Sequence, residues 1–261
     1  MRRAALRTPR ATGACVKNTC KCSKRWWLWA SPVFWAIASS PSQAGVVLNN
    51  TRLVFDGSKK EASLTVSNPT TQNYAIQAWV NTAQDDDTQV SPFMATPPLF
   101  RLDSRKEQGV RILDTGAALP ADRESLFYFN VQEIPAASSG EANVLKVALR
   151  TRIKLFYRPA GLNGSAALAG QQLQWSLMQH AGQRALQVSN PTPFHVSFIG
   201  IKVTNGEREH EIQAPLMVAP FATRAYPLDS PLWQPHSVVF STINDHGGYS
   251  QPSRVSLPGS A

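Results

Sequence analysis

The segment ANVLKVALRTRIKLFYRP, residues 142–159, alternates between apolar and cationic positions. The apolar positions are Leu145, Val147, Leu149, Ile153 and Leu155, and the cationic positions are Lys146, Arg150, Arg152, Lys154 and Arg158. A period of two predicts a β-strand of about fifteen residues, roughly 50 Å long, whereas most strands have about five or six residues. One face of this strand should be apolar and the other cationic.

Six further segments combine alternating or β-branched and aromatic residues with turn residues at their ends. They are 62–68 (ASLTVSN), 73–80 (NYAIQAWV), 124–134 (ESLFYFNVQEI), 173–179 (LQWSLMQ), 184–190 (RALQVSN) and 195–203 (HVSFIGIKV). No long helical pattern is present in residues 45–261. Short strands at regular spacing predict an all-β protein built from β-sandwiches.

One strand-and-turn motif occurs twice, as LTVSNPT in Leu64–Thr70 and as LQVSNPT in Leu186–Thr192. In both copies an alternating strand runs into Asn-Pro, where the proline cannot donate to a ladder and favours a turn. A Gly- and Ala-rich segment, residues 160–170, separates the copies. The pattern predicts two similar sandwich domains, residues 45–160 and 161–261.

The first 44 residues have the layout of a secretory signal peptide. Basic residues precede a thirteen-residue apolar stretch, Trp26–Ala38, which is too short to span a bilayer, and small residues follow it. Ser42 and Ala44 occupy the two positions that a signal peptidase recognises, which predicts cleavage after Ala44. The alternative is a buried helix.

Removal of this leader changes the charge and cysteine content. Eight of the 26 Lys and Arg residues and all three cysteines lie in residues 1–44, which contain no Asp or Glu. The remaining 18 basic and 17 acidic residues give a formal net charge of +1. The exported chain should therefore have no disulfide, and its charge does not favour nucleic acid or an anionic membrane as a partner.

The residues that could carry enzyme chemistry are few. Asp114-Thr115-Gly116 follows two apolar residues, as in an aspartic peptidase, but that chemistry needs a second such triplet, and the chain has none. The five histidines, at positions 180, 195, 210, 236 and 246, are far apart and should occupy surface or loop positions. Residues 85–88 (DDDT) lack the pattern of a calcium loop and indicate a solvated turn. These features predict a binding protein without catalytic residues, metal or cofactor.

The segment DRESLFYFNVQEIP, residues 122–135, together with residues 142–159, resembles the periplasmic chaperones of the chaperone–usher pathway. Shorter matches in the same order are TRLVFDGSKKEASLTVSN, QAWV, MATPPLFRLD, NPTP and INDHGG. The resemblance implies two immunoglobulin-like domains in an L-shaped (boomerang) arrangement. It also implies a non-enzymatic periplasmic protein of a Gram-negative bacterium that works without ATP, binds pilus or fimbrial subunits and delivers them to the outer-membrane usher.

The resemblance assigns roles to particular residues. Leu145, Val147 and Leu149 would enter the hydrophobic groove of a subunit that lacks its last strand, and Arg52 and Lys154 would bind the subunit's C-terminal carboxylate. Glu124, Arg158 and Asp245 match an ionic network between the domains, and Thr96, Pro98 and Ile134 match an apolar patch toward the usher. Lys146, Arg150 and Arg152 should be solvated and have no assigned role.

The connection PAASSGEA, residues 135–142, is similar to that of the short-loop branch of this family. Two alternatives remain open at this point. An exported aspartic peptidase would depend on Asp114, and a structural fibre subunit or adhesin would have an incomplete sandwich.

Overall fold

The computed structural model describes residues 45–85, 90–135, 147–180, 183–228 and 235–257. These residues form two β-sandwiches, each with its own hydrophobic core. The prediction of an all-β chain with two immunoglobulin-like domains is confirmed. The six strands expected from alternation are all present, although the strand expected from residue 195 begins at Phe198.

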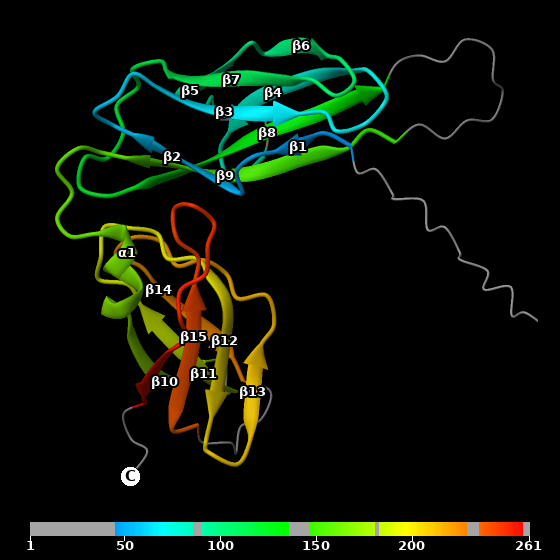
Figure 1. Ribbon diagram of the computed structural model, residues 1–261. Coiled ribbons are helices and arrows are strands. Elements are labelled where there is room, and N and C mark those ends of the chain that lie inside the picture. The colour runs from blue at the N-terminus through cyan, green and yellow to red at the C-terminus, as the bar shows by residue number, and fades with distance from the viewer. Residues whose placement is uncertain (1–44, 86–89, 136–146, 181–182, 229–234, 258–261) are drawn as a thin grey trace, which may run out of the picture. The chain divides into compact units, whose positions relative to one another are not determined.

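The first sandwich consists of a five-stranded and a four-stranded sheet (Figure 1). The five-stranded sheet has the order β2 (Arg52–Asp56), β9 (Arg150–Arg158), β8 (Ser125–Pro135), β4 (Tyr74–Asn81) and β6 (Leu99–Leu102). The four-stranded sheet has the order β1 (Val47–Leu48), β3 (Glu61–Ser67), β7 (Glu107–Asp114) and β5 (Phe93–Thr96). Strands β2 and β9 are parallel, whereas the other paired strands of both sheets are antiparallel. Phe55, Ile76 and Phe129 are fully buried between the sheets.

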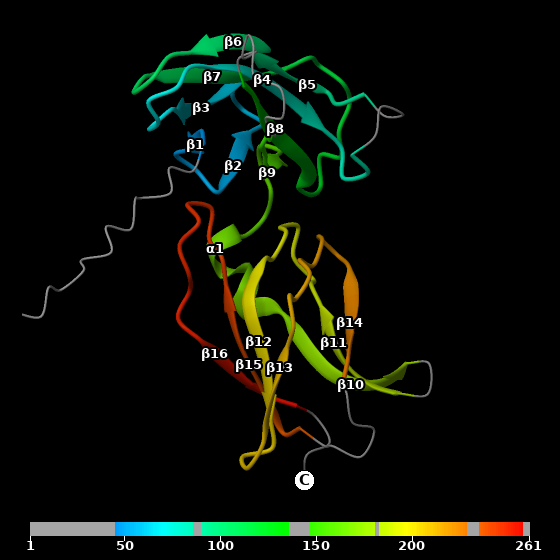
Figure 2. The same cartoon turned by 90° about the vertical axis from the view of Figure 1, so that its right-hand side faces the viewer.

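The second sandwich consists of a three-stranded and a four-stranded sheet, which lie on two sides of its core (Figure 2). The three-stranded sheet has the order β10 (Gln174–His180), β11 (Gln183–Ser189) and β14 (Thr223–Pro227). The four-stranded sheet has the order β13 (Glu209–Ile212), β12 (Phe198–Thr204), β15 (Ser237–Thr242) and β16 (Ser253–Ser256). A short helix, α1 (Ala166–Ala169), and a 3-10 turn, η1 (Gly170–Gln172), precede β10.

The repeated Asn-Pro-Thr motif forms the same buried corner in both sandwiches. The Asn68 side-chain amide donates to the Gln72 carbonyl oxygen at 2.7 Å, as Asn190 does to the Phe194 carbonyl oxygen at 2.7 Å. The hydroxyl group of the following threonine donates to the asparagine Oδ1 at 2.7 Å in each copy. Asn68 and Asn190 are 0% and 1% exposed, so each amide replaces water for the carbonyl groups around it. The sequence repeat therefore reflects a structural repeat.

The long strand expected over residues 142–159 is shorter than predicted. Among the described residues it begins at Arg150, whereas residues 142–146 lie outside them. The Glu133 amide still donates to the Leu149 carbonyl oxygen at 2.9 Å. The next rung of this antiparallel ladder would need an N–H group from residue 135, which is a proline and has none. Pairing with β8 ends there, and Val147 and Ala148 continue without a strand partner.

No helix in the described part of the chain is long and apolar enough to cross a membrane. The same residues contain no group of three or more His, Cys, Asp or Glu side chains arranged to hold a metal ion.

Candidate functional site

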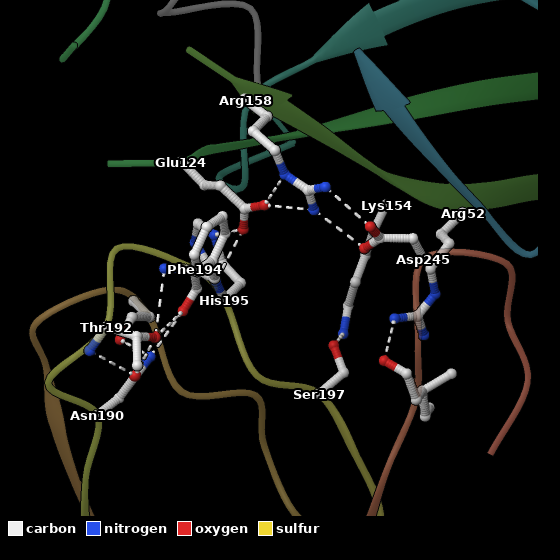
Figure 3. Close-up of polar contacts among 12 residues, drawn as sticks. Arg52, Glu124, Lys154, Arg158, Asn190, Thr192, Phe194, His195, Ser197 and Asp245 are labelled. Atoms are coloured by element: carbon white, nitrogen blue, oxygen red, sulfur yellow. Dashed lines mark hydrogen bonds and ion pairs between the residues drawn. The ribbon is translucent and has the colours of Figure 1, made fainter. Parts of the chain in front are cut away.

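Two cations, the buried Arg52 and the half-buried Lys154, lie side by side on neighbouring strands. Arg52 begins β2, and the parallel register with β9 pairs it directly with Lys154. Because side chains alternate along a strand, both point away from the core face that Leu53 and Leu155 occupy. Figure 3 shows both side chains extending toward the second sandwich, where Arg52 donates to the Ile243 carbonyl oxygen at 3.1 Å and Lys154 donates to the Ser197 hydroxyl oxygen at 3.3 Å.

Neither member of this cation pair forms an ion pair with a carboxylate of the described residues. Arg52 is 7% exposed, and its Nε has no hydrogen-bond acceptor within that part of the chain. Burial lowers the pKa of Arg52, and the charge of Asp245 partly opposes this. Burial also lowers the pKa of Lys154, and the neighbouring Arg52 charge lowers it further. Two like charges with unused donors form a site suited to an anion.

Arg158, four residues after Lys154, is fully paired. Its guanidinium group donates to Glu124 at 2.8 Å and to both oxygens of Asp245, at 2.8 and 3.0 Å (Figure 3). Burial alone would lower the pKa of Arg158, but its bonds to Asp245 and the charges of both carboxylates outweigh burial and raise it. The guanidinium carbon also lies 5.4 Å from the centre of the Phe194 ring. The structure thus brings together Glu124, Arg158 and Asp245.

His195 was expected at a surface or loop position, and it lies in the connection between β11 and β12, although its side chain is not at the surface. Its side chain is only 6% exposed, and its ring centre lies 5.3 Å from that of Phe156. The second oxygen of Glu124 accepts a hydrogen bond from the His195 backbone N–H at 2.7 Å and lies 3.2 Å from Nδ1. Glu124 needs this second partner because its side chain is 2% exposed, and an unsatisfied buried carboxylate is costly.

Arg150 is exposed, as expected, whereas Arg152 is half-buried, and both have specific contacts that were not expected. Both side chains are about one-third exposed or less and form ion pairs with Asp85. The guanidinium group of Arg150 lies over the Trp79 ring at 4.9 Å, and that of Arg152 lies over the Tyr128 ring at 3.9 Å. Planar guanidinium groups stack well on aromatic rings, so these two arginines cover the outer face of the sheet.

The residues expected to enter a subunit groove are partly described. Val147 and Leu149 are 60% and 49% exposed, so neither is buried in the protein's own core. Leu145, like Lys146, lies outside the described residues. On its other side, β9 is paired with β2 only from Lys154 onward. Arg150 to Ile153 therefore present an open edge among the described strands, which continues into the exposed apolar residues.

The expected apolar patch comes from three neighbouring elements. Thr96 ends β5 and is half-buried, whereas Pro98 and Ile134 are exposed. The Pro98 carbonyl oxygen accepts a hydrogen bond from the Ala78 amide in β4, the strand that also pairs with β8 beside Ile134. Pro98 and Ile134 are thus held by the same sheet.

The remaining candidate chemistry is structural. Asp114 ends β7, is exposed, and accepts a hydrogen bond from the Gly116 amide at 2.9 Å, as expected for a polar turn. Asp85, the first residue of the expected solvated turn, instead bonds to Arg150, and residues 86–88 lie outside the described residues. Of the other histidines, His236 and His246 are exposed, as expected, whereas His210 is half-buried.

Several contact residues were not among the predicted site residues, and they include His195, Ser197 and Ile243. A signal for the first was available in the sequence. The first Asn-Pro-Thr motif is followed by the polar residues Thr71 and Gln72, whereas the second is followed by Pro193 and Phe194. Phenylalanine is among the residues most often buried, so Phe194 should pack against other parts of the chain. For Ser197, an ordinary strand-like segment gave no comparable signal.

Both sandwiches match the models of known protein families. Residues 45–163 match the model of the pili and flagellar-assembly chaperone PapD N-terminal domain, and residues 168–254 match that of the pili assembly chaperone PapD C-terminal domain. Together these matches span nearly all of the chain after residue 44.

Individual relatives agree with this assignment. Chaperone protein LpfB of Salmonella typhimurium is 41% identical over 214 residues, which is 81% of this chain and 88% of the relative. Chaperone protein PapD of Escherichia coli is 37% identical over 212 residues, 80% and 85% of the two chains. The crystal structure of the YadV chaperone has a TM-score of 0.70 at 32% identity and covers 81% of this chain and all of its own. The SafB chaperone, solved with the SafA pilin, has a TM-score of 0.69 at 29% identity, covering 82% and 96% of the two chains.

Proposed function

Because this chain belongs to the PapD family of pilus-assembly chaperones, we propose that it holds its subunit with a strand lent by the segment before and within β9 and with the cation pair Arg52 and Lys154. The protein is a chaperone of pilus or fimbrial subunits, and the outer-membrane usher is its partner in the pathway. The family is one of chaperones, and neither an aspartic peptidase nor a fibre subunit is supported.

The observation that carries the proposal is the cation pair Arg52 and Lys154. Both side chains are held in place by neutral acceptors, a backbone carbonyl oxygen and a serine hydroxyl, so their charges are not neutralised there. A C-terminal carboxylate has two acceptor oxygens and one negative charge. Such a group would satisfy the free Nε donor of Arg52 and relieve the repulsion between the two cations.

The open edge of β9 supports the second part of the proposal. A subunit that lacks its last strand would gain main-chain hydrogen bonds from this edge and fill its groove with Leu145, Val147 and Leu149. Burying three such side chains contributes on the order of 5 kcal/mol before the cost of ordering. The exposure of Val147 and Leu149 agrees with this use.

The distance between Leu149, which would enter the groove, and Lys154, which would bind the carboxylate, would fix the register of the added strand. Lys154 lies five residues beyond Leu149, roughly 17 Å along an extended strand. A slip by one residue would turn every apolar side chain away from the groove, and a bound carboxylate would prevent that slip.

Further parts of the proposal rest on the family resemblance. Glu124, Arg158 and Asp245 would maintain the geometry between the two domains, 45–160 and 161–261, and Thr96, Pro98 and Ile134 would contact the usher. Residues 1–44 would be a signal peptide that directs the protein to the periplasm and is cleaved after Ala44. The short connection over residues 135–142 agrees with the short-loop branch, whose members serve rod-like pili or fimbriae.

The test is co-expression with the cognate subunit. Arg52→Ala and Lys154→Ala should each remain folded yet reduce the co-purified complex at least about tenfold, because a charged hydrogen bond is worth about 1.5–3 kcal/mol. Lys202→Ala is the matched control, since Lys202 is exposed and lies on the second sandwich. A normal complex yield from both cation variants would contradict the carboxylate anchor.

A further inference from the structure

Glu133 occupies a core-facing position in β8. Phe127, Phe129 and Val131 precede it with the same alternation and are buried in the first core. Glu133 continues this row and is itself only 6% exposed. A carboxylate in such a place is costly unless a hydrogen bond and a counter-charge accompany it.

The residues beside this carboxylate are Gly45 and Val46. The Val46 backbone N–H donates to Glu133 Oε1 at 2.5 Å, and both residues at the start of the described chain are buried. The contact with Gly45 is so close that a Cβ atom built there would collide with the carboxylate group. The ion pairs of the described side chains do not include Glu133. The hydrogen bond is therefore present, and a counter-charge from a side chain is not.

The predicted cleavage after Ala44 would make Gly45 the N-terminal residue. We propose that Glu133 is the counter-ion of the α-ammonium group formed there, an inference that rests on the predicted cleavage. Hydrolysis of the Ala44–Gly45 peptide bond consumes one water molecule, leaves a carboxylate on Ala44 and frees the Gly45 amine, which takes up a proton. The new positive charge forms one residue from an existing hydrogen bond to the buried carboxylate.

Glu133 also contacts the segment Val147–Leu149, which we propose enters the subunit groove. The Glu133 amide donates to the Leu149 carbonyl oxygen, which is the last hydrogen bond of the ladder before the unpaired residues Val147 and Ala148. An ion pair at Glu133 would therefore hold both the N-terminus and Leu149 in place on β8. Removal of the leader would thus complete the edge that binds the subunit.

The test is a double-mutant cycle on the free chaperone. One change adds Gly-Ser before Gly45, which moves the ammonium group away, and the other is Glu133→Gln, which keeps an acceptor for Val46 but removes the charge. Each single change should lower the melting temperature by about 5 °C, and the extension should have little further effect in the Glu133→Gln protein. Glu107→Gln, at an exposed position in β7, is the matched control in which the extension keeps its full effect.

Additive effects of the extension and Glu133→Gln would overturn the proposal. So would mass spectrometry of the exported protein showing an N-terminus other than Gly45. The cycle is measured without a subunit, so additive effects would contradict the Glu133 proposal without bearing on the carboxylate anchor. In the same way, a normal complex yield from the Arg52 and Lys154 variants would contradict the anchor without changing the meaning of the cycle.

Discussion

Lys154 and Arg158 lie four residues apart on the same face of β9, yet their surroundings differ. Arg158 is matched by two carboxylates, Glu124 and Asp245, whereas Lys154 has a serine hydroxyl group and a neighbouring arginine. Accordingly the pKa of Arg158 is raised by its partners despite burial, and that of Lys154 is lowered by burial and by Arg52. A half-buried cation that is paired with carboxylates stabilises the structure, and one without such a pair is available to a ligand.

The largest expected effect comes from breaking the matched cation. Arg158→Met leaves Glu124, which is 2% exposed, without its cationic partner, and should lower the free energy of unfolding by about 3 kcal/mol. Lys154→Met is the control of similar shape, because it removes a half-buried charge that has no carboxylate partner among the described residues. It should leave stability unchanged or raise it, as measured by urea unfolding. Equal losses in both variants would show that the two cations are not distinct.

A smaller effect should follow from giving Lys154 a carboxylate of its own. Ser197 Oγ lies 3.3 Å from Lys154 Nζ, so Ser197→Asp places a competing anion at the site. Affinity for a peptide with the subunit's free C-terminus should fall about tenfold, or about 1.4 kcal/mol, in a calorimetric titration. Ser197→Asn supplies the same shape without the charge and should bind nearly as the parent does. Equal weakening by both substitutions would indicate a steric effect instead.

This contrast could be predicted from the sequence only in part. The alternation of residues predicted that Lys154 and Arg158 lie on one face of the strand, and the family resemblance implied that Arg52 and Lys154 bind a carboxylate together. Their direct pairing in register depends on a parallel contact between strands about 100 residues apart, which no local pattern encodes. The same limit explains the early end of the β9 ladder, which is set by the missing N–H of Pro135.

The contacts of Arg150 and the burial of the His195 side chain could not be predicted, for a similar reason. The sequence neighbours of each residue give no sign of its partners. These partners, Trp79 and Asp85 for Arg150 and Glu124 and Phe156 for His195, lie tens of residues away. The Asn-Pro-Thr corners were predictable because their hydrogen bonds close within five residues of sequence.

The smallest expected effect is a pH dependence of stability that arises from Lys154. Since burial lowers the pKa of Lys154 in the folded protein, the unfolded chain binds more protons between that lowered pKa and the ordinary lysine value of about 10.4. The free energy of unfolding should therefore rise with pH across this window, as the cost of burying the ammonium group is relieved. In Lys154→Met this rise should be absent, so its stability advantage over the parent should shrink as the pH approaches 10. Parallel curves of unfolding free energy against pH for the two proteins would contradict a half-buried ammonium group without a counter-charge at this position.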